Sequence, residues 1–177
     1  WGVTFQQGGL ISAMTLAENL SLPLELHTDL DRRARAAMID YKLSLVGLAG
    51  YESHYAAQIS GGMRKRAALA RALMLDPSIL FFDEPSAGLD PISSRRLDTL
   101  IASLADSLGA TVVMVTHELD SIFAIANKAV YLDNVTKTLL DIGSPEQLRD
   151  HSRHPVVREF FQRDGRPSRT TGIGPDA

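Results

Sequence analysis

The 177-residue sequence contains no cysteine. This absence excludes disulfide frameworks, thiolate zinc sites and cysteine nucleophiles, and it is typical of a reducing compartment. Long apolar runs are missing as well. Stretches such as Thr111–Val115 and Ile79–Phe82 are far shorter than the roughly 20 residues that span a bilayer. No segment is therefore expected to cross a membrane by itself.

An excess of positive charge is also lacking, since the formal net charge is -3 and the pI is about 5.9. Strong sequence-independent binding to nucleic acid is not expected from such a chain.

Neither an initiator methionine nor a charged-then-apolar signal sequence is found at Trp1. We therefore expect the sequence to be a fragment with an interior start. Its length predicts one domain, which can have two lobes.

The first part of the sequence is predicted to be mainly helical. A strand-like opening, Val3–Phe5, is followed by a mixed stretch, Leu10–Leu26, which Pro23 interrupts and which we expect to be a loop with short helices. Apolar residues then recur with helical spacing in Asp29–Val46 and in Ser60–Leu75. Each of these two segments is predicted to be an amphipathic helix.

The second part alternates short apolar runs with helical patterns, which indicates βαβ units and a parallel sheet. The successive segments are Ile79–Phe82, Pro91–Leu108, Thr111–Val115 and Glu118–Asn127. Two further short strands are expected at Ala129–Leu132 and Thr138–Ile142, followed by a helix that opens with the capping box Ser144-Pro145-Glu146-Gln147. The Gly-, Pro- and Arg-rich segment Asp164–Ala177 has little to bury and is predicted to be a disordered tail.

The segment Ser60-Gly61-Gly62 precedes a predicted helix. One interpretation is simply a serine N-cap followed by two glycines. The other is an anion site, because a helix N-terminus offers unpaired N–H groups and the positive end of a dipole, and glycines let a phosphate approach the backbone.

Two adjacent carboxylates, Asp83 and Glu84, end the apolar run Ile79–Phe82 and precede Pro85. A solvated strand end is the simplest interpretation. The alternative is a pair with two tasks at the tip of a strand, because alternate residues of a strand point to opposite faces. The proline predicts an extended backbone at Glu84.

Three further polar residues follow predicted strands or precede a helix. Asp90 stands before Pro91, an arrangement typical of a helix N-cap. The simplest interpretation of His117, which follows Thr111–Val115, is a polar residue at the end of a strand. The simplest interpretation of Gln6 is an ordinary loop glutamine.

Taken together, these motifs resemble the ATP-hydrolysing subunits of ABC transporters. Ile59 to Leu73 is similar to the signature sequence and its helix, Ile79 to Pro85 to the Walker B strand, and Ser86 to Asp90 to the D-loop. The resemblance runs from Val3 to about Phe161. It implies an α/β P-loop NTPase (ABC ATPase) fold that lacks its N-terminal portion, with a parallel sheet flanked by helices and a helical lobe.

The resemblance also implies a role for each site residue. Glu84 polarises the attacking water, and His117 contacts the γ-phosphate as the switch histidine. Asp83 and Gln6 hold Mg²⁺, and Gln6 also senses the permease. Gln7 is the alternative for this position, but the phenylalanine immediately before Gln6 favours Gln6. ATP is contacted by Ser60, Gly61, Gly62, Gln6 and Asp90, the last from the D-loop at a dimer interface.

A partial ABC ATPase domain is thus expected over 1–163, with a helical lobe at about 10–75 and a RecA-like lobe at about 76–163. The implied partners are transmembrane permease subunits, a second ATPase subunit and lipid-binding accessory proteins, at the cytoplasmic face of the inner membrane. Four features look most like the Mla-type family of lipid trafficking and organic-solvent tolerance: Phe5 to Leu10, Met63, Gly88 to Ile92 and Val156 to Phe161. This implies that the complete subunit powers lipid transport.

An ABC ATPase also needs a P-loop with a Gly-Lys pair, and the sequence contains no Gly-Lys dipeptide. We therefore expect a truncated ATPase that is inactive alone and exposes an apolar sheet face. The alternative is a non-catalytic interaction or regulatory protein that keeps only the signature half-site; intact Glu84 and His117 favour the ATPase. A DNA-repair ATPase of the same superfamily would need a long coiled coil between Gln6 and Ser60, and that interval is too short.

Overall fold

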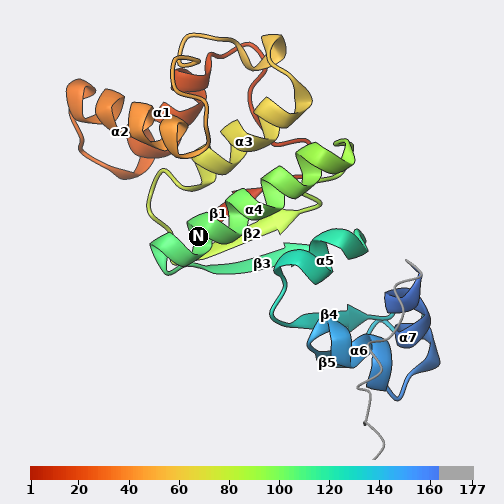
Figure 1. Ribbon diagram of the computed structural model, residues 1–177. Coiled ribbons are helices and arrows are strands. Elements are labelled where there is room, and N and C mark those ends of the chain that lie inside the picture. Colours follow the sequence, from red (N-terminus) through yellow and green to blue (C-terminus); the bar gives the residue numbers. More distant parts are fainter. Residues whose placement is uncertain (164–177) are drawn as a thin grey trace, which may run out of the picture. The chain divides into compact units, whose positions relative to one another are not determined.

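Three parallel strands form the sheet on which the first part of the chain is built: β1 (Gly2–Thr4), β2 (Ile79–Asp83) and β3 (Thr111–Val115). In the computed structural model they lie in the order β1-β2-β3, with Gly2 paired to Leu80 and Asp83 paired to Val115. Helix α4 (Pro91–Leu108) connects β2 to β3 (Figure 1). The predicted βαβ unit is thereby confirmed, and the carboxyl ends of all three strands lie along one edge of the sheet.

The structure describes residues 1–163 and divides them into two units, one from Trp1 to Glu118 and one that begins at Leu119. The predicted disordered tail, Asp164–Ala177, lies outside the described residues. The division between a helical lobe and a RecA-like lobe near residue 75 stays a prediction. Within the first unit the two proposed lobes are connected, because β1, which precedes the helical segment, pairs with β2, which follows it.

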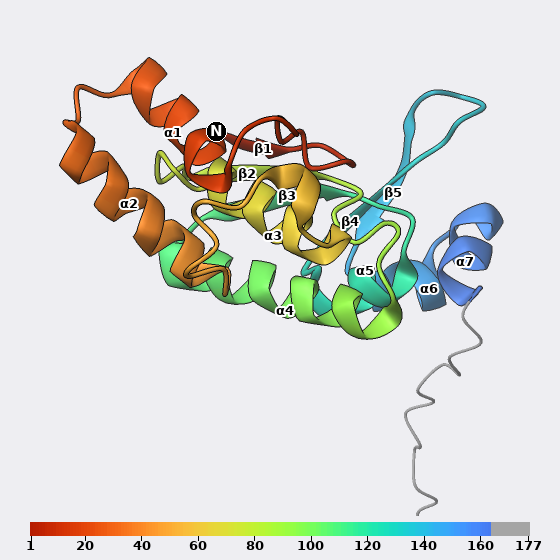
Figure 2. The ribbon, with the colours of Figure 1, turned by 90° about the horizontal axis from the view of Figure 1, so that it is seen from above.

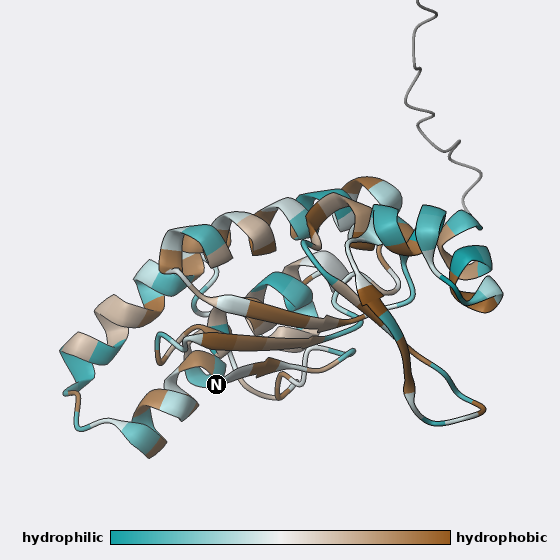
Figure 3. Ribbon diagram, turned by 90° about the horizontal axis from the view of Figure 1, so that it is seen from below, coloured by the Kyte–Doolittle hydropathy of each residue, from teal (hydrophilic) through white to brown (hydrophobic). Residues whose placement is uncertain are grey.

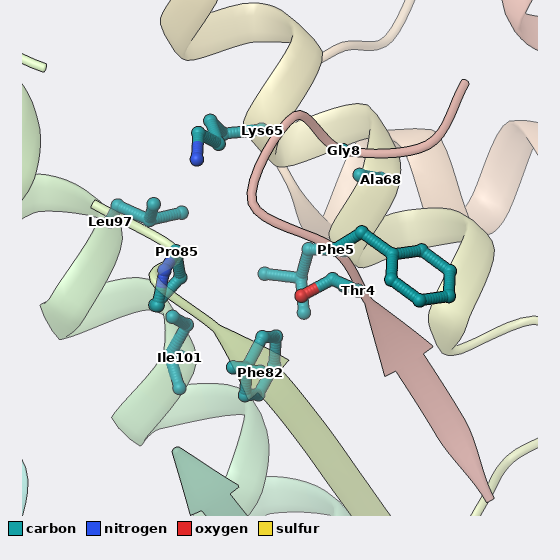
Figure 4. A pocket seen from close by; sticks show the side chains of 10 residues that line it. Thr4, Phe5, Gly8, Lys65, Ala68, Phe82, Pro85, Leu97 and Ile101 are labelled. Carbon is teal, nitrogen blue, oxygen red and sulfur yellow. The ribbon is translucent and has the colours of Figure 1, made fainter. Parts of the chain in front are cut away.

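Helices α3 (Gly61–Ala72) and α4 cover one face of this sheet (Figure 2). Thr4, Leu80 and Phe82 point to that face and are at most 6% exposed. Between the two helices and the strands is a small cavity, lined in part by Thr4, Phe82, Leu97 and Ile101 (Figure 4). The core of the first unit therefore lies on this face.

The opposite face of the sheet carries apolar side chains that no helix of the first unit covers, as expected from the sequence. Figure 3 shows the three strands from this side. Val3 and Val113, which flank Phe81 in register, are each 43% exposed, and Val115 is 64% exposed. The sheet thus has one buried apolar face and one open one.

Helix α1 (Leu16–His27) corrects the prediction of a loop with short helices, because it continues through Pro23. A proline inside a helix costs about 3 kcal/mol. Here Leu16, Leu20 and Leu24 form a stripe that is at most 1% exposed, and burial of such a stripe outweighs that cost. The helix packs against both α2 (Arg32–Leu45) and α3.

The predicted helix boundaries need smaller corrections. Asp31 caps α2 by accepting a hydrogen bond from the Ala34 amide, so the helix begins three residues after Asp29. Helix α3 ends at Ala72 and not at Leu75, because the chain turns there towards Asp76, whose φ is 44°. A short 3-10 turn, η1 (Ala56–Gln58), precedes α3 and was not predicted.

The second unit combines an antiparallel strand pair with three short helices. Strands β4 (Ala129–Leu132) and β5 (Leu139–Gly143) pair with each other, near their predicted positions. The helices are α5 (Leu119–Ile125), α6 (Pro145–His151) and α7 (Pro155–Gln162). Ser144 and Gln147 form the predicted capping box of α6, whereas α7 was not predicted separately.

The core of the second unit contains the buried side chains of Leu119, Ile122, Leu148, Val157 and Phe161. Phe123 and Phe160 meet Phe161 edge to face. None of the helices among residues 1–163 is both long and apolar enough to span a membrane.

Candidate functional site

Four of the predicted site residues lie at or just after the carboxyl ends of the three strands. Gln6 lies in the turn after β1, Asp83 and Glu84 lie at the end of β2, and His117 follows β3. Because the strands are parallel neighbours, these three chain segments emerge at the same edge of the sheet. Ligand sites of open α/β sheets lie outside this carboxyl edge.

The Glu84 carboxylate is the best-connected group of this edge. One of its oxygens, Oε1, lies 2.7 Å from Nδ1 of His117, and the other, Oε2, accepts a hydrogen bond of 3.1 Å from the Thr116 hydroxyl. Its side chain is 15% exposed, whereas that of His117 is 74% exposed. The structure therefore brings together the two residues that the sequence predicted to be catalytic.

The backbone of Glu84 corrects the prediction of an extended conformation before Pro85. Its φ is 46°, which is the left-handed region. The Glu84 amide donates to the Val115 carbonyl at 2.9 Å, and the Glu84 carbonyl accepts from the Ala87 amide at 3.2 Å. Proline disfavours the right-handed helical region for the residue before it, but these hydrogen bonds stabilise the left-handed region instead of an extended one.

The pKa of His117 is raised above its ordinary value, first by the hydrogen bond to the Glu84 carboxylate and then by the negative charge of that carboxylate. The charge of Glu118 acts in the same direction. Nδ1 is the donor towards Glu84 when the ring is protonated. The pair can therefore hold a proton at the edge of the sheet.

Asp83 and Gln6 are both exposed, and they lie at the ends of neighbouring strands. Within residues 1–163, no group of three or more acidic, histidine or cysteine residues forms a metal cage. One carboxylate and one amide oxygen nevertheless fit Mg²⁺, since this ion keeps several waters and is bound in proteins by one or two carboxylates plus substrate phosphates. The donor set is thus compatible with Mg²⁺.

Ser60 is the N-cap of α3, and its hydroxyl accepts a hydrogen bond of 3.2 Å from the Met63 amide. Gly61 is exposed, and a Cβ at this position would meet no atom within 4 Å. At Gly62 a Cβ would approach only Leu89, at 3.9 Å. The N-terminus of α3 is therefore open to a ligand, and the N-cap interpretation and the anion-site interpretation are compatible.

Asp90 caps α4 as predicted: its Oδ1 atom accepts hydrogen bonds of 3.0 Å from the Ile92 and Ser93 amides. Hydrogen bonds from Ser93 contribute most to lowering the pKa of Asp90. This capping role accounts for the residue locally. It does not bring Asp90 into hydrogen-bond contact with Glu84 or His117.

Three residues of the edge were not predicted. Thr116 holds the Glu84 carboxylate, and its place between strand β3 and His117 was the available signal. Lys65 donates to the backbone carbonyls of Gln6 and Glu84, the latter at 3.1 Å. Arg71 donates to the carbonyl of Gly9 at 2.8 Å and to that of Gly8 at 3.3 Å. Both basic residues interrupt the apolar pattern of α3, yet only the fold shows which carbonyls they reach.

Comparison with known proteins agrees with the fold. Residues 1–87 match the family model described as ABC transporter. The chain is 41% identical over 161 residues to the "Probable ribonucleotide transport ATP-binding protein mkl" of Mycobacterium tuberculosis, a match that covers 91% of this chain. It is 35% identical over 161 residues to the "Methionine import ATP-binding protein MetN" of Streptococcus agalactiae, again over 91% of this chain. The chain spans 44% of the length of each of these curated relatives.

A solved structure is similar as well: the ATP-binding cassette MJ0796, described as dimeric, in a post-hydrolysis state and bound to ADP and Pi. The TM-score is 0.66 and the sequence identity is 32%, and the match covers 75% of this chain and 58% of the solved one. The predicted α/β architecture is thereby confirmed. The chain forms part of an ATP-binding domain of the ABC transporter family.

Proposed function

We propose that this chain supplies the Walker B, switch and signature segments of an ATP-hydrolysing subunit of an ABC transporter. The observation that carries the proposal is the contact of Glu84 with His117 at the carboxyl end of β2, beside Asp83. A carboxylate whose two oxygens are both hydrogen-bonded is fixed in orientation at this edge. It can therefore orient and polarise a water molecule, as phosphoryl transfer to water requires. Glu84 is the general base in this proposal.

The neighbouring residues have matching roles. Asp83 and Gln6 hold Mg²⁺, which when bound neutralises charge on the phosphates. His117 lies at the exposed end of the edge, where its protonated ring can donate to the γ-phosphate while Glu84 keeps the ring oriented. Because the pKa of His117 is raised by Glu84, the ring keeps a proton to a higher pH than a free histidine does.

The signature segment acts on the nucleotide of a second subunit in this proposal. The hydroxyl of Ser60 is engaged by its own helix, and Gly61 and Gly62 leave the N-terminus of α3 open. Such a helix end binds phosphate through its free amides and its dipole. Asp90, at the N-terminus of α4, belongs to the segment that crosses the dimer interface. The dimeric arrangement of the similar solved cassette supports this assignment.

Activity requires segments that the printed 177 residues do not contain, since they include no Gly-Lys pair of a P-loop. We place the complete subunit at the cytoplasmic face of the inner membrane, bound to permease subunits. The relatives are named for ribonucleotide transport and for methionine import. We propose lipids as the substrate class of this protein, with lipid-binding accessory proteins, on the motif at Met63, Gly88 to Ile92 and Val156 to Phe161.

The decisive experiment is the substitution Glu84→Gln in a complete subunit that contains this chain. Removing the carboxylate eliminates the base but keeps the side-chain shape, so steady-state ATP hydrolysis should fall at least about a hundredfold. Binding of ATP should remain, because the amide repels the γ-phosphate less than the carboxylate does. Phosphate release measures turnover, and calorimetric titration with Mg-ATP measures binding.

A matched control is Glu118→Gln, which removes one nearby carboxylate that does not touch His117 by hydrogen bonding. This variant should retain turnover within a few-fold of the wild type. Turnover of Glu84→Gln at the level of the control would assign the base to another residue. Stimulation of hydrolysis by lipid vesicles, tested beside ribonucleotides and methionine, distinguishes the proposed substrate class from those of the named relatives.

A further inference from the structure

Lys65 connects two loops that the site uses. It lies in the second turn of α3, and its side chain reaches towards the segment that begins at Pro85 (Figure 4). Its ammonium group donates to the carbonyl of Gln6 in the loop after β1 and to the carbonyl of Glu84, at 3.1 Å, after β2. One side chain is thus hydrogen-bonded to the backbone of both segments, which are 78 positions apart in the sequence.

The backbone conformation of Glu84 depends on the hydrogen bonds that its carbonyl accepts. The left-handed φ of Glu84 is uncommon for a residue other than glycine, and such a conformation persists only where its surroundings hold it. Two donors reach this carbonyl, Lys65 and the Ala87 amide. Of these, Lys65 is the charged one, and hydrogen bonds to charged groups are roughly twice as strong as neutral ones.

The surroundings of Lys65 also depart from those of a solvated surface lysine. Burial is the first cause that lowers the pKa of Lys65, and the negative charges of Glu118, Glu84 and Asp83 oppose that effect. A partly buried ammonium group is stable only with hydrogen-bond acceptors and opposite charge around it. The acidic residues of the site therefore stabilise the Lys65 ammonium group, and this group in turn stabilises the backbone of Gln6 and Glu84 by hydrogen bonding.

We propose that Lys65 is a positioning residue, which sets the backbone of Glu84 and couples it to the loop of Gln6. The inference rests on the proposed function, in which Glu84 is the base and Gln6 a ligand of the metal. In consequence a displacement of the Gln6 loop is transmitted to Glu84 through the ammonium group. Lys65 touches neither substrate nor metal in this arrangement.

Arg71 provides a natural comparison on the same helix. Its guanidinium donates to the carbonyls of Gly8 and Gly9, so both of these hydrogen bonds go to the loop after β1. Loss of Arg71 should loosen the first loop alone, whereas loss of Lys65 should loosen both. This difference separates a specific link from general destabilisation of α3.

Amide hydrogen exchange tests the link in the chain itself, without ATP. The reporters are the Gly8 amide, which donates to the Phe5 carbonyl at 2.7 Å, and the Ala87 amide, which donates to Glu84. In Lys65→Met both amides should exchange about tenfold faster, as expected for loss of a charged hydrogen bond. In Arg71→Met only Gly8 should do so, and Lys65→Arg should restore both. Faster exchange at Gly8 alone in Lys65→Met, or no change at either amide, would overturn the proposal.

Kinetics of the complete subunit test the consequence. Lys65→Met should lower kcat about tenfold and change KM for ATP much less, because the base is misplaced while the nucleotide contacts remain; Lys65→Arg should recover part of the loss. Lys128→Met, the same change at an exposed position, should leave kcat unaltered. An unaltered kcat in Lys65→Met would refute the positioning role. A wild-type subunit without ATPase activity would instead refute the proposed function, and the exchange experiment would still decide whether Lys65 links the two loops.

Discussion

His117 and Glu84 form an ion pair in which the histidine is exposed and the carboxylate is largely buried. A histidine whose pKa is raised by such a partner stabilises the folded state in its protonated form. This contribution is fully present below the ordinary histidine pKa of about 6.5, and it is lost as the pH rises through the raised pKa of the folded state. The pair is therefore strongest on the acidic side of neutrality.

We predict that Glu84→Gln returns the pKa of His117 towards its ordinary value, because it removes the negative charge of the carboxylate and replaces a charged hydrogen-bond acceptor with a neutral one. Glu118→Gln, which removes the weaker influence, should shift this pKa less. The ring C–H chemical shifts of His117 followed against pH by NMR measure both effects, with His117→Asn used for assignment. A larger shift for Glu118→Gln than for Glu84→Gln would contradict the geometry.

At the scale of elements, an ion pair between a buried lysine and an exposed aspartate connects α2 to the turn before β2. Lys42 belongs to α2 and its side chain is 2% exposed, whereas its partner Asp76 is 62% exposed. The Lys42 ammonium also lies 5.7 Å from the ring centroid of Tyr41. A buried ammonium that loses its partner pays the cost of desolvation without compensation, so the two halves of this pair are not equivalent.

We predict that Asp76→Asn lowers the free energy of unfolding by about 1–3 kcal/mol, while Lys42→Met has a smaller effect because methionine fills the space without a charge. Asparagine tolerates the left-handed backbone of this position, where φ is 44°, so the comparison isolates the charge. Urea unfolding of both single variants and of the double variant measures the coupling. If Asp76→Asn costs as much in the Lys42→Met background as in the wild type, the pair does not contribute through its charge.

Element positions could be predicted where one local pattern dominates. Helix α4 and strands β3 and β4 have the boundaries expected from Pro91–Leu108, Thr111–Val115 and Ala129–Leu132. Helix α1 could not be predicted in this way, because the stripe that carries it past Pro23 is stabilised by α2 and α3. Tertiary packing overrides local propensity in such a case.

At the scale of the whole molecule, the open face of the sheet has a consequence for the first unit. Val113 and Val115 are exposed on this face, whereas Leu80, one strand away on the other face, is 1% exposed. Contiguous exposed apolar side chains promote association. The 177-residue chain should therefore self-associate through this face of the sheet.

We predict that Val115→Thr reduces self-association and changes the free energy of unfolding by no more than about 0.5 kcal/mol, as for surface substitutions in general. The matched control is Leu80→Thr on the covered face, which should cost about 2–5 kcal/mol because it leaves a cavity and buries a hydroxyl. Sedimentation velocity measures the association, and urea unfolding measures the stability. If Val115→Thr associates as strongly as the wild type, this face of the sheet is not the interface of self-association.

The sequence by itself determined the order of the motifs, the strand-end carboxylates and the caps at Ser60 and Asp90, because each depends on neighbours a few residues away. Only the tertiary structure decided the contacts between those motifs. The left-handed backbone of Glu84, its hydrogen bonds to Thr116 and His117, and the double attachment of Lys65 all join segments that are distant in the sequence. Such contacts arise from the parallel register of β1, β2 and β3, which brings the ends of separate strands to one edge, and no local pattern encodes that register.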